Sequence, residues 1–221
     1  MEQHKNVFIV GLLASRGNPI KALETSLRLS SLAGFPYETL ILYDEQDENF
    51  WKNINVPKMT FWKMPPTLNV TQCHQYALKK LITTNATHIV LLTDDLLPGL
   101  NWLRILVETS LTGVVLANTG TGDYLGFSAG LCEIQFLKDM YGEELWPICY
   151  KHYYADADAE IGFLARMNNK HYYQPNSVLY HADYELGFRA PPSGERLIGK
   201  LKDEELFNSR RAKYIANRNF S

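Results

Sequence analysis

The feature that most constrains this chain is an alternation of short apolar runs with segments of helical periodicity in its first half. The run Val7–Leu13 is almost continuously apolar, as expected of a strand buried on both faces of a sheet. Ile20–Leu32 follows with apolar residues at helical spacing, and Gly34 and Pro36 end that helix. Further strands are expected at Thr39–Tyr43, Met59–Trp62, His88–Leu92 and Gly113–Ala117, and further helices at Thr71–Thr83 and Trp102–Thr109. This order predicts an α/β fold with a mixed, mostly parallel sheet flanked by helices.

The second half of the chain follows a different pattern. Thr119–Gly126 is rich in Gly and Thr and is expected to be a loop. Helices are expected at Cys132–Tyr141 and Asp156–Met167. Two short strands, Tyr172-Tyr173 and Val178–His181, are expected on either side of a Pro-Asn pair.

Composition excludes several classes of protein. The 221 residues are 46% hydrophobic and 21% charged, as in a folded globular chain. The formal net charge of −2 argues against a broadly basic protein that coats nucleic acid. The 3 cysteines form no C-x-x-C pair, which excludes a zinc ribbon and favours a reducing compartment. Val7–Leu13 is too short to span a bilayer, so we expect a cytoplasmic protein without a transmembrane segment.

Acidic residues follow two of the expected strands. Asp94 and Asp95 come directly after one strand and Asp44 after another. Open α/β sheets bind ligands outside the carboxyl ends of their strands, where a hard divalent cation between carboxylate and phosphates would offset the charge. Alternatively, Asp94 or Asp95 caps a helix that begins near Pro98, and Asp44 is a turn residue in a solvated acidic stretch.

Two further groups could carry chemistry. Asp156, Asp158 and Glu160 alternate with alanines at the start of an expected helix, where acids favour the helix dipole. The functional alternative is a carboxylate base aimed into a cleft, with Asp156 and Glu160 on one face of the helix and Asp158 turned away from it. His181 ends the last expected strand, and it is either structural or completes a metal site.

The order of these features resembles the GT-A fold nucleotide-sugar glycosyltransferases, especially the inverting family 2 type, over roughly Val7 to His181. The resemblance implies a metal-dependent enzyme that transfers a sugar, with inversion, from a nucleoside diphosphate donor to an acceptor hydroxyl. The first candidate for the donor is a UDP-sugar. The implied donor-binding residues are Ala14, Arg16, Asp44 and Asp94, the implied ligands of Mn²⁺ or Mg²⁺ are Asp95 and His181, and the implied general base is Asp156. Tyr153, Tyr154 and Trp146 are either an apolar wall for sugar or acceptor or ordinary packing residues.

The chain departs from the family pattern at three positions. Thr93 stands in place of the first acid of the Asp-x-Asp metal motif, Ala155 precedes Asp156 where an acid is usual, and His74-Gln75 stands where Arg-Asn is frequent. Two alternatives therefore stay open. One is a nucleotidyltransferase, although the loop after the first strand is a poor basic phosphate loop. The other is a non-catalytic nucleotide-sugar-binding module.

We expect one domain over residues 1–209, with a nucleotide-binding half at about 1–118 and an acceptor half at about 119–209, followed by a basic tail at 210–221. The acceptor stays open among a glycan, a lipid carrier and a modified DNA base. The tail could contact an anionic acceptor or a membrane surface, which makes peripheral membrane attachment an alternative. The simpler interpretation of the tail is a solvated terminus.

Overall fold

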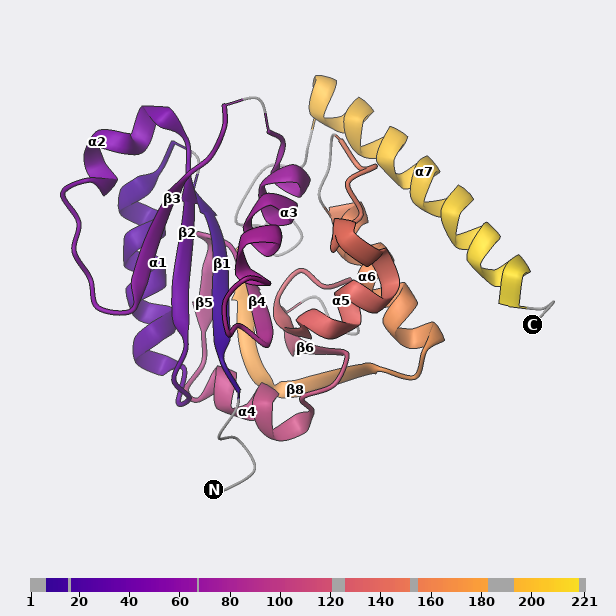
Figure 1. The fold of residues 1–221 in the computed structure, drawn as a ribbon, viewed down its shortest axis with the longest axis horizontal. Helices are drawn as coiled ribbons and strands as arrows, with labels where there is room; N and C mark the ends of the chain where they lie inside the picture. Colours follow the sequence, from indigo (N-terminus) through magenta and orange to yellow (C-terminus); the bar gives the residue numbers. More distant parts are fainter. Residues whose placement is uncertain are drawn as a thin grey trace.

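The computed structural model describes residues 7–15, 17–66, 68–120, 126–151, 155–182 and 193–218. Their strands form one eight-stranded sheet in the order β3-β2-β1-β4-β7-β6-β8-β5 (Figure 1). Its first half is parallel and consists of β1 (Ile9–Ser15), β2 (Glu38–Tyr43), β3 (Met59–Lys63) and β4 (His88–Leu92). Its second half is mixed and consists of β5 (Leu96–Pro98), β6 (Val114–Asn118), β7 (Gly130–Glu133) and β8 (His171–His181).

Helices cover both faces of the sheet. The main helices are α1 (Pro19–Leu32), α3 (Val70–Leu81), α4 (Trp102–Thr109), α5 (Ile134–Tyr141), α6 (Ala155–Met167) and α7 (Gly194–Arg218). Short turns of helix complete the set: η1 (Glu45–Asp47), α2 (Glu48–Trp51) and η2 (Gly142–Glu144). Two apolar cores result, because successive strand residues point to opposite faces. Val10 and Leu12 join α3, α5 and α6 in one core, whereas Ile9 and Leu13 join α1 and α4 in the other.

The predicted fold class is confirmed: this is a single α/β domain with a mixed, mostly parallel sheet flanked by helices. Across the described residues, no helix combines the length and the apolar character needed to cross a membrane.

The helix predicted over Cys132–Tyr141 is wrong at its start. Its first residues belong to β7, an antiparallel strand between β4 and β6, and α5 begins only at Ile134. Strands β6 and β7 approach closely at Gly130 of β7, where an added Cβ would lie 2.3 Å from the carbonyl oxygen of Val115 in β6. Pairing with two distant strands therefore decides the local structure here.

The two strands predicted around Pro175 are one strand, β8. Its register against β6 runs to Ala117 opposite Gln174 and resumes with Asn118 opposite Val178, so the residues between bulge out of the ladder. Pro175 has no N–H to give to a ladder, which explains why the irregularity lies there.

Helix α7 was not predicted. The expected boundary at Arg210 falls inside it, in its last third. The Arg210 guanidinium reaches α6, where it donates to both carboxylate oxygens of Glu160 at 2.5 and 2.8 Å. Glu160 is completely buried, so this ion pair fixes α7 to the domain.

Candidate active site

Three chain segments meet at the carboxyl edge of the parallel strands. Ser15 at the end of β1 is in register with Tyr43 of β2, and Leu13 is in register with Leu92 at the end of β4. Asp44 directly follows β2 and Thr93 directly follows β4. The loop after β1 and both acidic turns therefore lie at the same edge, which is where open α/β sheets bind ligands.

Asp95 and His181, predicted from distant parts of the chain as metal ligands, are in contact. The Asp95 Oδ1 atom lies 3.0 Å from Nε2 of His181. The antiparallel pairing of β5 with β8 brings them together, because His181 is in register with Leu96. Two backbone hydrogen bonds fix the pair: Ala182 N–H donates to the Asp95 carbonyl at 3.0 Å, and His181 N–H donates to the Thr119 carbonyl at 3.1 Å.

Thr93 orients the Asp95 carboxylate. The Asp95 side chain is only 3% exposed, and the Thr93 hydroxyl donates to its Oδ1 atom at 2.5 Å. A buried carboxylate is stable only when such donors compensate its lost hydration. Thr93, which departs from the Asp-x-Asp pattern, is thus a hydrogen-bond donor to Asp95.

The helix-cap alternative for Asp94 and Asp95 is wrong. The two acids lead into strand β5, and the next helix, α4, begins at Trp102 with Asn101 at its N-cap position.

Asp95 and His181 offer two candidate ligand atoms, which do not make a complete metal site. Within the described part of the chain, no group of three or more His, Cys, Asp or Glu side chains is placed to hold a metal. One carboxylate oxygen and one imidazole nitrogen suit a divalent cation such as Mn²⁺, and phosphate and water oxygens can complete its coordination. The residues present therefore fit a cation that is shared with a phosphorylated ligand.

The first turn of α1 lies beside Asp94. The Lys21 ammonium is 4.0 Å from Asp94 Oδ1, and the Thr25 hydroxyl donates to the Asp94 carbonyl at 2.9 Å. Asn18 caps this helix through a hydrogen bond from the Lys21 N–H, and Pro19 opens it. The sequence analysis did not identify Lys21, although a lysine in the first turn of the helix that follows the first strand indicates an anion-binding edge.

Asp47 ties the loop after β1 to the loop after β2. Its side chain accepts a hydrogen bond from the Gly17 N–H at 3.0 Å, and the residue is buried, with 8% of its surface exposed. Asp47 is therefore not part of a solvated acidic stretch. Of the predicted donor-binding residues, Ala14 lies in β1 and Asp44 directly follows β2, whereas Arg16 lies outside the described residues.

Helix α6 carries the predicted general base. The helix begins at Ala155, so Asp156 lies in its first turn, and the Asp156 side chain lies outside what the structure describes. Asp158 and Glu160 are both completely buried. Glu160 accepts three hydrogen bonds from α7, two from Arg210 and one from Tyr214. It accepts a fourth from the Tyr150 hydroxyl at 2.6 Å, which marks it as a structural anchor.

Two tyrosines next to Glu160 are strongly perturbed. Burial and the adjacent carboxylate raise the pKa of Tyr150 well above its usual value. The same two causes raise the pKa of Tyr214 to about 12. Both side chains therefore remain neutral hydrogen-bonding groups at physiological pH.

The structure describes one of the three residues of the predicted aromatic wall. Trp146 is 1% exposed and packs in the core, with its ring centroid 5.2 Å from that of His74. Trp146 is therefore a packing residue and does not line a site for sugar or acceptor. Tyr153 and Tyr154 lie outside the described residues.

No protein-family model and no curated protein sequence matches the chain. Solved structures do. A mannosyltransferase from Pyrobaculum calidifontis, PcManGT, in complex with GDP-Man and Mn²⁺, matches with a TM-score of 0.61 at 12% identity over 81% of this chain and 58% of that chain. S. aureus TarS 1-349 in complex with UDP-GlcNAc matches with a TM-score of 0.54 at 12% identity over 86% of this chain and 60% of that chain.

A third structure, 4-diphosphocytidyl-2C-methyl-D-erythritol synthase from Anaerococcus prevotii, matches with a TM-score of 0.55 at 11% identity over 81% of this chain and 92% of that chain. The fold is GT-A-like. The chain spans less than two thirds of the PcManGT and TarS chains, and identities this low establish the fold alone.

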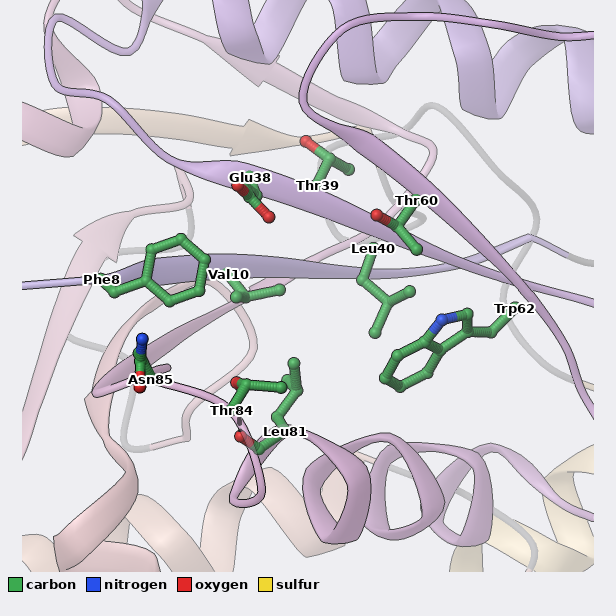
Figure 2. Close-up of a pocket in the computed structure, with 10 residues that line it drawn as sticks. All are labelled: Phe8, Val10, Glu38, Thr39, Leu40, Thr60, Trp62, Leu81, Thr84 and Asn85. Atoms are coloured by element: carbon green, nitrogen blue, oxygen red, sulfur yellow. Dashed lines mark hydrogen bonds between the residues drawn. The ribbon is translucent and has the colours of Figure 1, made fainter.

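A separate hollow of about 360 Å³ lies at the opposite end of the parallel strands (Figure 2). Phe8 and Trp62 stand on either side of it, and Leu81 from the end of α3 closes it from below in this view. Glu38 is the charged residue among its walls. None of the described site residues predicted from sequence lines this hollow, so it is distinct from the edge that holds Asp95 and His181.

Proposed function

We propose that this chain is a glycosyltransferase that moves a sugar from a nucleoside diphosphate donor to an acceptor hydroxyl with inversion. The contact between Asp95 and His181 at the carboxyl edge of the sheet is the observation that carries the proposal. It supplies one oxygen and one nitrogen ligand at the place where this class of fold binds nucleotides. In support, two structures of similar fold hold the sugar nucleotides GDP-Man and UDP-GlcNAc.

The donor, with a UDP-sugar as the first candidate, would lie along the edge formed by the turns after β1, β2 and β4. Asp44 would accept hydrogen bonds from the base or ribose, and Asp94 from the ribose or sugar. Ala14 and Arg16 would border the nucleotide in the loop after β1. Lys21, beside Asp94, adds a positive charge that favours the diphosphate.

Asp95 and His181 would hold Mn²⁺ or Mg²⁺. When bound there, the cation supplies positive charge that stabilises the departing diphosphate. The chain's own contribution is to hold the two ligands rigidly, through Thr93 and the β5–β8 pairing.

Asp156 would act as the general base. Its carboxylate accepts the proton of the acceptor hydroxyl while the acceptor oxygen forms its bond to the anomeric carbon. The bond from that carbon to the diphosphate oxygen breaks on the opposite side, and the electron pair leaves with the diphosphate. Base assistance of this kind is typically worth about 10²–10⁴-fold in rate.

The test is a transfer assay with a panel of UDP- and GDP-sugars, Mn²⁺ or Mg²⁺, and glycan, lipid-carrier and modified-DNA acceptors. Asp95→Ala should lower donor turnover by at least about 100-fold, because losing even a supporting group of a metal ligand costs about 10–100-fold. Asp156→Ala should lower it by about 10²–10⁴-fold. Glu108→Ala, a matched change at a surface carboxylate that is 63% exposed, should leave it unchanged. Turnover that survives in both site variants would refute these roles.

A nucleotidyltransferase is the second candidate, favoured by the similarity that covers 92% of the A. prevotii synthase chain. It predicts pyrophosphate release from a nucleoside triphosphate, which a glycosyltransferase does not produce. A non-catalytic binding module predicts calorimetric binding of a nucleotide-sugar with no turnover under any of these conditions.

A further inference from the structure

Helix α7 has an inner face that packs on the domain and an outer face that does not. On the inner face, Asp203 is 3% exposed, and Phe207 and Tyr214 each place a ring centroid 6.4 Å from that of Phe163 in α6. On the outer face, Ile198 and Leu201 are 55% and 56% exposed. Figure 1 shows α7 along one side of the molecule, with α6 on its inner side.

The exposed residues recur at the spacing of a coiled coil. Along the outer face, positions alternate in steps of three and four: Ile198, Leu201, Glu205, Asn208, Ala212 and Ile215. All six are exposed, and apolar side chains stand at both ends of the series. A helix of 25 residues is long enough to pair over this whole series.

We propose that α7 pairs with α7 of a second copy of this chain, antiparallel, about a two-fold axis that passes between positions 206 and 207. This register places Ile198 opposite Ile215 of the partner subunit and Leu201 opposite Ala212 of the partner subunit. Glu205 then lies opposite Asn208 of the partner subunit. A two-fold axis makes every contact twice, so one self-complementary helix face suffices.

Charge selects the antiparallel direction. Glu204 and Arg211 are exposed and border the outer face on the same side. In the antiparallel pair, Glu204 lies within one turn of Arg211 of the partner subunit, and the symmetry repeats this opposite-charge contact. A parallel pair would instead bring Glu205 against its own copy. Arg211 already rests over the Phe163 ring at 5.4 Å, which keeps its guanidinium at the border of the two faces.

A membrane surface fits this face less well. Glu205 and Asn208 interrupt the apolar series at its centre. The carboxylates of Glu205 and of Glu204 at its border would be repelled by anionic headgroups. The exposed apolar area is confined to the two ends of the helix. We therefore expect a reversible dimer that dissociates on dilution, because the interface is small relative to permanent ones.

Sedimentation velocity of the full chain over a concentration series tests the proposal. The unmodified chain should form a species of twice its 25.3 kDa mass. Leu201→Glu should shift this equilibrium to monomer. Glu204→Arg alone and Arg211→Glu alone should each do the same, because each places like charges opposite one another twice.

An equimolar mixture of the Glu204→Arg and Arg211→Glu chains is the decisive sample. It should recover dimer, because each helix then meets opposite charges at both contacts. Lys213→Glu, the same charge change as Arg211→Glu but off the paired face, should leave the dimer intact. Melting temperatures of all variants verify that each is folded.

Three results would overturn the inference. The first is an unmodified chain that remains monomeric at every concentration. The second is a dimer that Leu201→Glu leaves unchanged. The third is a mixture of the two charge variants that stays monomeric while each is folded. Binding of the monomer to lipid vesicles through Leu201 would assign the outer face to a membrane instead.

Discussion

Replacing Arg210 with methionine should destabilise the fold strongly, because it leaves a completely buried carboxylate without its charged partner. Glu160 is 0% exposed and receives two hydrogen bonds from the guanidinium. Methionine keeps most of the aliphatic stem and removes only the charge and its donors. The perturbation is therefore close to a pure deletion of one side of the ion pair.

The magnitude follows from what remains around Glu160. Removing one partner of a buried ion pair costs about 3–5 kcal/mol. Two features place Arg210→Met at the lower end: the Arg210 side chain is 31% exposed, and Glu160 keeps its hydrogen bonds from Tyr150 at 2.6 Å and Tyr214 at 3.2 Å. We expect a loss of about 3 kcal/mol, which corresponds to a fall in melting temperature of about 6–12 °C for a domain of this size.

Urea unfolding followed by circular dichroism, with thermal melts in parallel, measures this loss. Glu160→Gln should cost less, about 1–2 kcal/mol, because the partly exposed guanidinium can be hydrated once its partner is neutral. The double variant Glu160→Gln/Arg210→Met should be more stable than Arg210→Met alone, because no charge is left buried. A double variant less stable than Arg210→Met, or a single loss below about 1 kcal/mol, would show that the ion pair does not hold α7.

Three smaller predictions also concern stability. The pKa of Tyr214, raised from 10.0 to about 12, means that the folded state holds this proton more tightly, so stability present below pH 10 is lost as pH rises toward 12. Tyr214→Phe should flatten that alkaline loss in melting temperature. Burial lowers the pKa of His88 below 6.5, so its contribution is present above pH 6.5 and is lost as pH falls, and His88→Gln should flatten the acid side of the same profile. Gly113→Ala should cost about 1–3 kcal/mol in urea unfolding, because φ is +72° and a Cβ would lie 2.3 Å from the Lys170 carbonyl. Gly142→Ala, with φ of +60° and nothing within 4 Å, should cost less.

The elements predicted correctly are those whose sequence pattern is local. Helix α4 has the predicted bounds Trp102–Thr109, and β1, β2, β4 and α1 agree within two residues at either end. In each, burial of one face or of both leaves a periodicity that the apolar residues display directly. Their order was enough to predict the parallel half of the sheet.

The missed elements depend on distant partners. Strand β5 has three residues, Leu96–Pro98, and its ladder is with β8. Strand β7 lies where an apolar run leads straight into a helix, so its four residues resemble a helix start. The anchor of α7 is an ion pair between residues far apart in sequence, which spacing alone cannot show.

The candidate site likewise contains residues that were predicted before the structure and residues that were missed. The resemblance to the GT-A glycosyltransferases implied that Asp95 and His181 share one site, and the structure puts them 3.0 Å apart. Lys21 and Asp47 were missed, because each matters through a contact with another loop, with Asp94 and Gly17 respectively. The role of Asp156 remains a proposal that kinetics must test.

The Glu160 anchor also bears on that test, because Glu160 follows Asp156 by one helical turn in α6. Arg210 thus acts on the turn of helix that would carry the general base, whereas the proposed donor site lies on β1, β2 and β4. Under conditions where Arg210→Met is folded, we therefore expect kcat for transfer to fall while KM for the donor stays unchanged. Arg210→Lys should recover part of kcat, since it restores the charge but not the bidentate contact. A variant that raises donor KM and leaves kcat unchanged would separate α7 from the catalytic step and would contradict the placement of the base on α6.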